Sequence, residues 1–438
     1  MRRQAAILKT VAFRTFIGVA VCGLASLAGL SGFSPAAVPF ALHPSDTVVF
    51  YGDSITDQRM YTMLTELFVV TRYPKLNVNF VHSGWGGDRV TGGGGGPIDT
   101  RLERDVIAYH PTVMTIMLGM NDGNYANHTA ADDTTYFDGY KHIINSVQSA
   151  IPALRLTLIE PSPYDDVTRP FILQPDGYNA VLRKYGDWIR NYAAEKNLGF
   201  ADLNTGVVAM LRRANAEDPA VAQKIVPDRV HPAWGGHLIM AEQLLKAWQA
   251  RPVVSAVTID AARGKVVEAD FAKITDLHNG VPFLWTETDE ALPLPFANLL
   301  ANDKDHSLNL AIKSSDVTEA LNRQPLRVIG LADGKYKLTI DGAPVGTFSQ
   351  AEFEQGINLA VLDTPMSRQA MEVRDWTQKR LDVHQQEWRT FRVPLGSLAL
   401  QHLDETLKDM NAIDAEIASR QRAAAQPLAH VYQVTQAQ

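Results

Sequence analysis

The feature that most constrains the fold is an alternation, from Thr47 to about Ala250, of short apolar runs with longer amphipathic segments. Short apolar runs bounded by turn residues are typical of buried strands, and a 3.6-residue periodicity is typical of helices. The predicted strands are Thr47–Tyr51, Asn77–Val81, Thr112–Leu118, Leu154–Glu160 and Gly199–Asp202, and the predicted helices are Met60–Thr71, Tyr136–Ala150, Tyr178–Lys196 and Trp234–Trp248. Strands that alternate with helices form βαβ units, so residues 42–250 are predicted to form an α/β domain with a parallel sheet.

The pattern changes after Ala250. Strand-like runs follow at Val253–Asp260, Gly264–Ala269 and Arg327–Ile329, and Gly334–Gly346 alternates around Asp341-Gly342, a hairpin signal. We therefore expect a β-rich accessory unit over 251–362, followed by a helical segment over 363–438. That segment contains two long amphipathic stretches, Met366–Arg389 and Ser397–Arg422, which suit a helical hairpin. The last dozen residues are a candidate for a disordered tail.

The first 41 residues have the pattern of a secretory signal peptide rather than of a folded domain. Basic residues come first, at Arg2, Arg3, Lys9 and Arg14. An apolar run rich in small residues follows from Thr15 to Gly32, and two small-residue cleavage sites come next, Ser34-Pro35-Ala36 and Pro39-Phe40-Ala41. We expect an exported protein, periplasmic or extracellular, with no stable membrane span after cleavage. A retained N-terminal anchor is the alternative.

Composition limits the partners. The net charge of -7 provides no basic excess to attract nucleic acid. The single cysteine, Cys22, lies in the predicted signal peptide, and no His-Glu-x-x-His motif occurs, so we expect neither a metal nor another cofactor. Five consecutive glycines, Gly92–Gly96, predict a mobile loop, since they lack the Lys-Ser/Thr sequel of a phosphate-binding loop. The oligomeric state is not predictable from these features.

Three predicted strands lead into polar or glycine-rich turns, Gly52-Asp53-Ser54, Gly84–Gly87 and Gly119–Asp122. Parallel sheets bind ligands beyond the carboxyl ends of their strands, so a site is expected where these turns meet. Ser54 would be a nucleophile held at the end of the first strand. Taken alone, the same residues also suit a turn with a helix cap.

The stretch "VPDRVHPAWGGH" supplies a base and its partner. In Asp228-x-x-His231 the carboxylate can reach Nδ1 of the imidazole across one turn, and Pro232 suits the start of the next helix. Histidine is the usual base at neutral pH, because its ordinary pKa is about 6.5. Backbone N–H groups of Gly87 and Ser54 and the side-chain amide of Asn121 are candidate donors to a developing oxyanion.

Four blocks, "YGDSIT", "SGWGGD", "LGMND" and "DRVH", occur in this order between Thr47 and Ala250. This part of the chain resembles the SGNH hydrolase family, which includes the GDSL esterases and lipases. The resemblance implies a flavodoxin-like three-layer α/β/α fold. It implies Ser54 as nucleophile, His231 as general base and then acid, and Asp228 as the residue that orients the imidazole. It also implies an oxyanion hole formed by Ser54, Gly87 and Asn121.

Two departures from the family pattern lie at the expected pocket rim. The second block often opens with asparagine, where this chain has Val81-His82-Ser83-Gly84, and Arg89 stands where a small hydroxyl residue is common. Trp85 and Arg89 are candidates for an acyl or sugar subsite. Packing of the loop is the alternative for Trp85.

The expected function is hydrolysis of short-chain esters, such as acetyl groups on carbohydrates, through an acyl-enzyme. The substrate would be a small-molecule or polysaccharide ester, and activity should fall below about pH 6 as the base is protonated. Two alternatives stay open. The same acyl-enzyme could transfer its acyl group to a sugar, or the protein could be a non-catalytic binding module of the cell envelope.

Overall fold

The structure, a computed structural model, describes residues 39–280, 282–398 and 400–437. The predicted signal peptide, with Cys22, therefore lies outside the described residues except for its last three positions. In the described part of the chain, no helix combines the length and the apolar character needed to cross a membrane.

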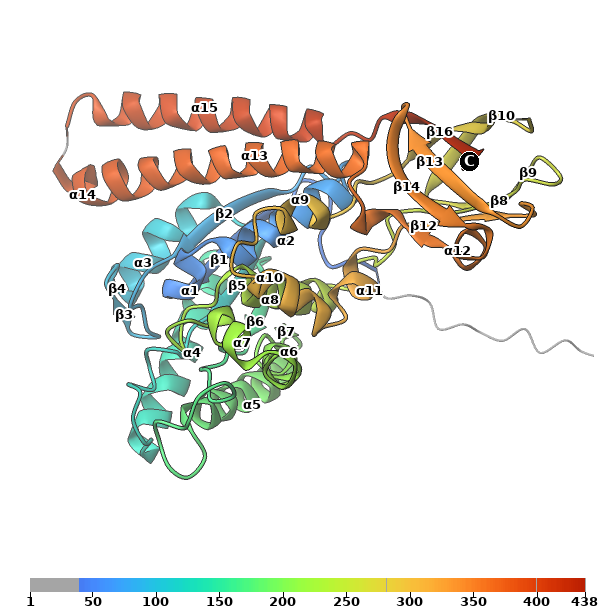
Figure 1. The fold of residues 1–438 in the computed structure, drawn as a ribbon. Helices are drawn as coiled ribbons and strands as arrows, with labels where there is room; N and C mark the ends of the chain where they lie inside the picture. The colour runs from blue at the N-terminus through green and yellow to red at the C-terminus, as the bar shows by residue number, and fades with distance from the viewer. Residues whose placement is uncertain (1–38, 281, 399, 438) are drawn as a thin grey trace, which may run out of the picture. The chain divides into compact units, whose positions relative to one another are not determined.

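A five-stranded parallel sheet in the order β2-β1-β5-β6-β7 forms the centre of the first domain (Figure 1). Its strands are β1 (Thr47–Gly52), β2 (Asn79–Gly84), β5 (Val113–Met117), β6 (Arg155–Ile159) and β7 (Gly199–Ala201). β1 and β5 are buried almost throughout because helices cover the sheet, which explains why their sequences are mostly apolar. The predicted α/β fold with a parallel sheet is confirmed.

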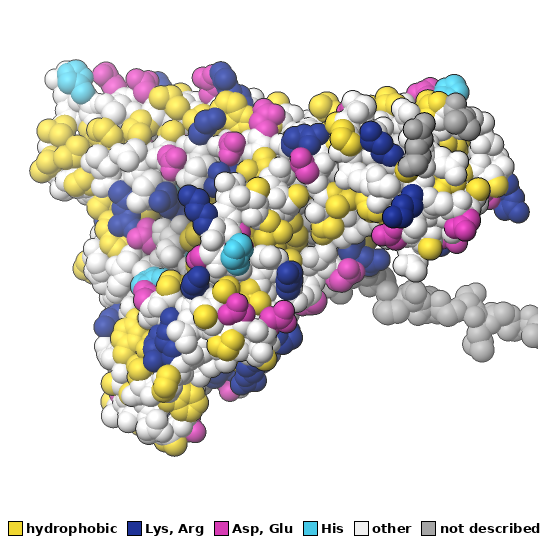
Figure 2. All heavy atoms as spheres, viewed as in Figure 1, with side chains coloured by type: hydrophobic (Ala, Val, Ile, Leu, Met, Phe, Trp, Pro, Cys, Tyr) yellow, Lys and Arg dark blue, Asp and Glu magenta, His cyan; other side chains and the backbone are white. Residues whose placement is uncertain are grey.

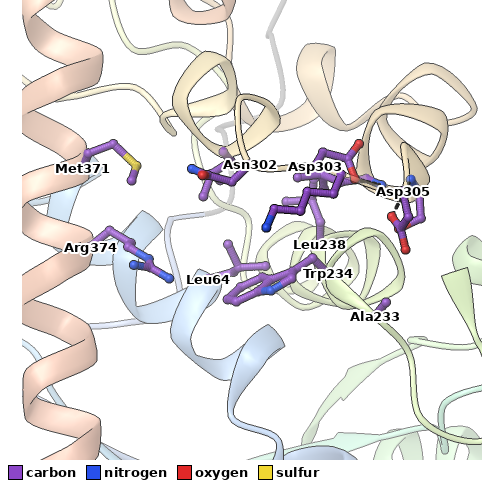
Figure 3. Close-up of a pocket in the computed structure, with 13 residues that line it drawn as sticks. Leu64, Ala233, Trp234, Leu238, Asn302, Asp303, Asp305, Met371 and Arg374 are labelled. Carbon is purple, nitrogen blue, oxygen red and sulfur yellow. Dashed lines mark hydrogen bonds between the residues drawn. The ribbon is translucent and has the colours of Figure 1, made fainter. Parts of the chain in front are cut away.

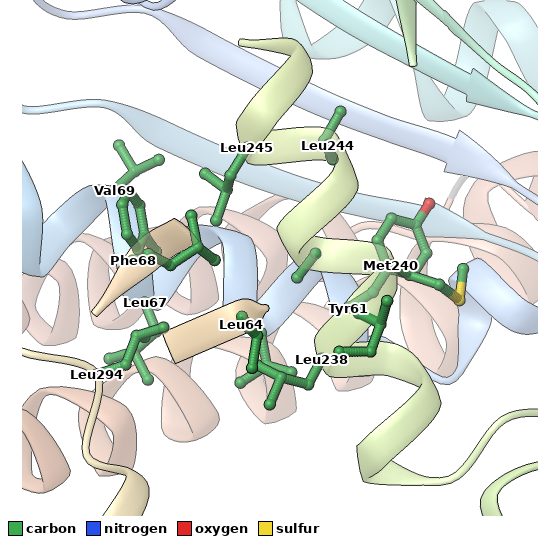
Figure 4. Packing of buried hydrophobic residues seen from close by; sticks show 14 of the residues in the cluster. Tyr61, Leu64, Leu67, Phe68, Val69, Leu238, Met240, Leu244, Leu245 and Leu294 are labelled. Carbon is green, nitrogen blue, oxygen red and sulfur yellow. The ribbon is translucent and has the colours of Figure 1, made fainter. Parts of the chain in front are cut away.

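Helices pack against this sheet, and the hydrophobic core lies between the helices and the strands. The longer ones are α2 (Met60–Arg72), α4 (Ala130–Ala150), α5 (Tyr178–Lys196), α6 (Thr205–Glu217) and α8 (Trp234–Ala247), and the shorter ones are α1 (Ser54–Asp57), α3 (Ile98–Asp105) and α7 (Pro219–Ile225). Leucines and aromatic residues of α2 and α8 interlock in the part of the core drawn in Figure 4. Tyr136 of α4 and Tyr185 of α5 stack with ring centroids 3.6 Å apart.

Two further sheets follow the α/β domain. One has the strand order β15-β12-β8-β9 and the other β10-β11-β16-β13-β14. Their strands are β8 (Ala256–Asp260), β9 (Lys265–Asp270), β10 (Ala272–His278), β11 (Phe283–Asp289), β12 (Pro325–Ile329), β13 (Lys335–Ile340), β14 (Ala343–Ser349), β15 (Ile357–Asn358) and β16 (Ala429–Gln436). The predicted hairpin at Asp341-Gly342 is confirmed, and both turn residues have positive φ, as its turn requires.

Short helices connect these strands. They are α9 (Phe296–Leu300), α10 (Ser307–Lys313), α11 (Val317–Leu321) and α12 (Gln350–Gln355). Sequence periodicity predicted none of them, because each is at most two turns long.

A helical hairpin lies between β15 and β16 in the chain. Its first helix, α13 (Pro365–Gln385), continues into a π-helical segment, η3 (Gln386–Arg392), and α14 (Val393–Leu395), and its second helix is α15 (Leu403–Ala424). α13 and α15 pack along each other (Figure 1). The Thr364 hydroxyl caps α13 by accepting the Ser367 N–H at 3.1 Å, and Pro365 occupies the first helical position.

A buried polar network attaches this hairpin to the α/β domain. The Glu66 carboxylate on α2 accepts hydrogen bonds from Gln421 (2.8 Å) and Arg380 (3.3 Å), and it contacts Nε2 of His82 at 2.9 Å. Arg380 also pairs with Asp414 at 3.1 Å. The Glu66 and Arg380 side chains are only 2% and 9% exposed, so the network is shielded from solvent.

Two expectations need correction. The last dozen residues are not a disordered tail, because β16 pairs with both β11 and β13 inside a sheet. The glycine run Gly92–Gly96, expected as a mobile loop, forms a short hairpin in which β3 (Gly92–Gly93) pairs with β4 (Gly96–Pro97). Glycine is needed for space at Gly93, where a Cβ would lie 2.6 Å from the Gly87 carbonyl oxygen, and for conformation at Gly96, which has φ +110°.

Candidate active site

The fold brings Ser54, His231 and Asp228 together at the carboxyl end of β1. Ser54 begins α1 directly after the strand, while the other two lie in the loop between α7 and α8. The Ser54 Oγ lies 2.8 Å from Nε2 of His231, and Nδ1 of the same imidazole lies 2.7 Å from Oδ2 of Asp228. These three side chains therefore form one hydrogen-bonded chain, although 177 residues separate the serine from the histidine.

Asp228 fixes both the backbone and the imidazole of His231. Its Oδ1 accepts the N–H groups of Val230 (2.9 Å) and His231 (2.7 Å). Burial alone would raise the pKa of Asp228, but these hydrogen bonds and the imidazole outweigh it and lower the pKa. An ionised carboxylate accepts the Nδ1 proton, which leaves Nε2 free to accept the Ser54 hydroxyl proton.

The site is open to solvent. The side chains of His231 and Asp228 are 36% and 55% exposed. Ser54 itself is half-buried, so solvent reaches the serine–histidine pair mainly from the side of His231.

Besides Ser54, the candidate oxyanion donors Gly87 and Asn121 lie on two turns, one after β2 and one after β5. Gly87 has φ +78° and open space where a Cβ would stand, so its turn requires glycine for conformation rather than for room. A Cβ on the preceding Gly86 would lie 4.0 Å from Cβ of Ser54, which places this turn against the serine. The Asn121 amide donates to the Asp88 carbonyl at 3.0 Å. Ser54, Gly87 and Asn121 are thus linked through direct neighbours.

Trp85 and Arg89, the candidates for substrate binding, have protein partners. The guanidinium of Arg389 lies 3.3 Å from the ring centroid of Trp85, and Trp388 meets the same ring edge-on at 5.3 Å. Arg89 donates to the Asn124 side chain at 2.6 Å. Trp85 is therefore part of the packing between η3 and the glycine-rich turn, and a role for either residue in substrate binding stays a prediction.

Two carboxyl groups of this region, those of Asp53 next to the serine in sequence and of Asp122, have buried oxygen atoms. Asp53 caps α1 by accepting the Ile55 N–H at 3.0 Å, and Asp122 accepts the Val90 N–H at 2.9 Å. Burial raises the pKa of Asp53 to about 7, with a further contribution from the charge of Asp122, and burial raises the pKa of Asp122 to about 6. At neutral pH each carries a charge only at a cost in folding free energy.

Replacing Asp53 by asparagine should remove a pH-dependent loss of stability. The folded pKa of about 7 exceeds the unfolded value of about 3.9, so the wild-type protein loses stability as pH rises from about 4 to about 7. The asparagine side chain would keep the cap acceptor and cannot ionise. The stability of Asp53→Asn relative to wild type should increase by roughly 2–3 kcal/mol between pH 5 and pH 8 in urea unfolding. A pH-independent difference would contradict the assigned pKa.

A cavity of about 590 Å³ lies beside the loop that carries His231. Ala233, two residues after the histidine, lines it, and Trp234, Leu64 and Leu238 form an apolar side (Figure 3). Polar side chains line the other side, namely those of Asn302, Asp303, Lys304, Asp305 and Arg374. The lining includes none of the three hydrogen-bonded residues, and it combines α2 and α8 with elements beyond residue 250.

Several residues of this region were not assigned a site role from sequence. Asp57 accepts the Gly86 N–H at 3.1 Å and pairs with Arg389 at 2.9 Å. His237 is buried, accepts the Tyr61 N–H at 3.2 Å and lies 3.1 Å from Oε1 of Gln58. Burial lowers the pKa of His237 to about 3, so it is a neutral structural residue. Within residues 39–280, 282–398 and 400–437, no cluster of His, Cys, Asp and Glu is arranged to hold a metal ion.

A parallel α/β domain with a Ser–His–Asp hydrogen-bonded chain at its strand ends defines the architecture of a serine hydrolase. Residues 50–239 match the GDSL-like Lipase/Acylhydrolase family, and this domain belongs to that family of SGNH-type esterases. An acetylxylan esterase from Geobacillus stearothermophilus is 26% identical over 221 residues, which are 46% of this chain and 93% of that enzyme. A solved structure of that esterase covers 48% of this chain and 99% of its own, with 24% identity and a TM-score of 0.38.

A likeness over nearly the whole chain exists with another solved structure, described as a gut microbial diltiazem-metabolizing enzyme. It covers 90% of this chain and 98% of its own chain, with 23% identity and a TM-score of 0.77. The two proteins therefore share the fold of the β-rich sheets and helical hairpin as well as that of the α/β domain.

Proposed function

We propose that this protein is a serine esterase that removes short acyl groups, chiefly acetyl, from carbohydrate esters through an acyl-enzyme. The observation that carries the proposal is the chain of hydrogen bonds from Asp228 through His231 to the Ser54 Oγ, at 2.7 and 2.8 Å. A serine hydroxyl becomes a nucleophile when a positioned base accepts its proton.

The reaction follows from this geometry. The Ser54 Oγ attacks the ester carbonyl carbon while its proton passes to Nε2 of His231. The carbonyl oxygen becomes an oxyanion that accepts hydrogen bonds from the N–H groups of Ser54 and Gly87 and from the Asn121 amide. The imidazolium then gives its proton to the leaving alkoxide, and the acyl group remains on Ser54. Water, deprotonated by His231, attacks the acyl-enzyme, and the imidazolium then returns this proton to the Ser54 Oγ as the bond to the acyl group breaks and the carboxylic acid leaves.

Two observations support a carbohydrate ester as the substrate. The site is open, with His231 and Asp228 one-third to one-half exposed, which suits a small acyl group on a bulky alcohol. The relative at 26% identity is an acetylxylan esterase. Acidic and basic side chains are interspersed on the face of the molecule drawn in Figure 2.

We also infer that the protein is exported. The basic start, the apolar run and the small-residue sites within residues 1–41 support this inference. Mass spectrometry of the protein from the periplasm or medium should find a new N-terminus near residue 36 or 41. Recovery of the intact chain from the cytoplasm alone would contradict export.

The acyl-chain preference tests the proposed function. Purified residues 39–438, which form one compact unit, should hydrolyse p-nitrophenyl acetate with a kcat/KM at least about tenfold above that for the octanoate. The same protein should release acetate from acetylated xylo-oligosaccharides, and Ser54→Ala should do neither. Faster cleavage of octanoate would contradict the assigned substrate, and activity equal in parent and Ser54→Ala would contradict the site.

Acyl transfer to a sugar hydroxyl is the second candidate, because an exposed His231 leaves room for an acceptor other than water. Product analysis with and without an added acceptor sugar separates the two reactions. If the parent is inert on every ester yet binds polysaccharide as well as Ser54→Ala does, the site is a binding module instead.

A further inference from the structure

One residue of the helical hairpin contacts both the glycine-rich turn after β2 and the helix that begins with Ser54. Nη2 of Arg389, on η3, donates to the Gly84 carbonyl at 3.1 Å across 305 positions of sequence. The same nitrogen pairs with Oδ2 of Asp57 at 2.9 Å. The guanidinium also covers the ring of Trp85 at 3.3 Å. Arg389 thus reaches the strand end of the second glycine-rich turn and the helix that begins with Ser54.

Asp57 connects Arg389 to the turn that carries the oxyanion donor Gly87. It lies three residues after Ser54 on α1, and its Oδ2 accepts the Gly86 N–H at 3.1 Å. The peptide that follows Gly86 carries the N–H of Gly87. The position of that donor relative to Ser54 therefore depends on the carboxylate that Arg389 holds.

The neighbouring Trp388 anchors η3 at this place. Trp388 is 1% exposed and donates from Nε1 to Oδ1 of Asp105 at 2.6 Å. Asp105 also pairs with Arg101, whose guanidinium donates to the Ser83 carbonyl at 2.8 Å. A π-helical turn is rare, and here it directs two consecutive side chains, Trp388 and Arg389, onto Trp85. The start of the glycine-rich turn is therefore bound by two arginines, Arg101 at the Ser83 carbonyl and Arg389 at the Gly84 carbonyl.

We propose that Arg389 is a positioning residue for ester hydrolysis, through which the C-terminal hairpin fixes the oxyanion donor at Gly87. The inference rests on the proposed function. Donors to an oxyanion act only when they are already in place, and a displacement of about 1 Å can cost roughly 100-fold in rate. The oxyanion exists in the transition state and not in the bound ester, so the loss falls on kcat rather than on KM.

Arg389→Gln tests the proposal. We expect kcat for p-nitrophenyl acetate to fall about 10- to 100-fold while KM stays within about threefold. The affinity for phenylboronic acid, which forms a tetrahedral adduct with a reactive serine, should fall in parallel with kcat. Arg392→Gln is the matched control, because Arg392 lies on the same π-helical segment and pairs with Glu387 of that segment (2.8 Å). Its kinetic constants should be those of the parent.

Asp57→Asn removes the other partner of the Arg389–Asp57 ion pair, and it replaces Arg389→Gln as the test if that variant does not fold. It keeps an acceptor for the Gly86 N–H but removes the charge that Arg389 pairs with, so kcat should fall in the same direction. The double variant should be no slower than the slower single variant, since both act on one link. Unchanged kcat in either single variant, or lowered kcat with unchanged phenylboronic acid affinity, overturns the inference and leaves the esterase assignment intact. A parent that is inert on all esters overturns both.

Discussion

His231→Ala is expected to lower kcat for p-nitrophenyl acetate by about four to six orders of magnitude. Nε2 of His231 is the base that lies within 2.8 Å of the Ser54 Oγ. Without it the hydroxyl proton has no acceptor and the leaving alkoxide no donor. The residual rate should equal that of Ser54→Ala and of the double variant, because the two residues act as one unit.

Asp228→Asn should lower kcat less, by about 100-fold. The Asp228 side chain is 55% exposed, so water can replace part of its hydrogen bonding. His142→Ala is the control. It removes another exposed histidine paired with a carboxylate, Asp99 at 2.6 Å, and should leave kcat unchanged. Loss of less than tenfold in His231→Ala would show that the proton acceptor is a different group.

Arg380→Met is expected to reduce the free energy of unfolding by about 3 kcal/mol at pH 7. The substitution keeps the apolar length of the side chain but leaves the buried carboxylate of Glu66 without its cationic partner. Burial alone would raise the pKa of Glu66, yet the hydrogen bond from His82 and the charge of Arg380 outweigh it and lower the pKa. This contribution is present above about pH 4.3 and is lost as pH falls through the folded pKa, so the destabilisation should shrink in acid.

Urea unfolding measures this effect, and two further variants define its cause. Arg420→Met removes an arginine of the same hairpin whose ion pair with Glu416 is 57% and 67% exposed, and it should cost less than about 1 kcal/mol. Adding Glu66→Gln to Arg380→Met removes the unpaired charge and should restore part of the stability. If Arg380→Met and Arg420→Met were equally stable, the buried network would not be what attaches the hairpin.

The α/β half of the fold is predictable because its patterns are local. α5 begins and ends where its periodicity predicts, at Tyr178 and Lys196, while β2 starts two residues later than predicted, after Asn77 with its positive φ. The β-rich half is less predictable. β11 alternates buried and half-buried residues, but two of its buried positions are Glu287 and Asp289, which a hydrophobicity pattern assigns to solvent.

β16 could have been found from its own sequence. It buries His430, Tyr432 and Val434 on one face, a period-two pattern that also fits β-propensity. Its position directly after a long helix made a disordered tail the simpler expectation.

The residues of the candidate site can be predicted from sequence because, like the strands that carry them, they form local patterns. Each block is a short turn with recognisable chemistry, and the parallel sheet brings the turns together. The contacts of Arg389 with Gly84 and Asp57 have no such signal, because they join segments more than 300 residues apart and depend on how the hairpin packs. The exposed fraction of Asp228 is likewise a property of the tertiary structure.

In the sheet with the order β10-β11-β16-β13-β14, the middle strand is β16, which is synthesised after every other strand of that sheet. Phe283 of β11 pairs with Val434, so closing this ladder joins residues about 150 positions apart, and the loop entropy must be overcome late in folding. Until then β11 and β13 each have an unpaired edge, which is the kind of surface that recruits other chains. During biosynthesis this sheet therefore needs protection from aggregation until β16 is in place.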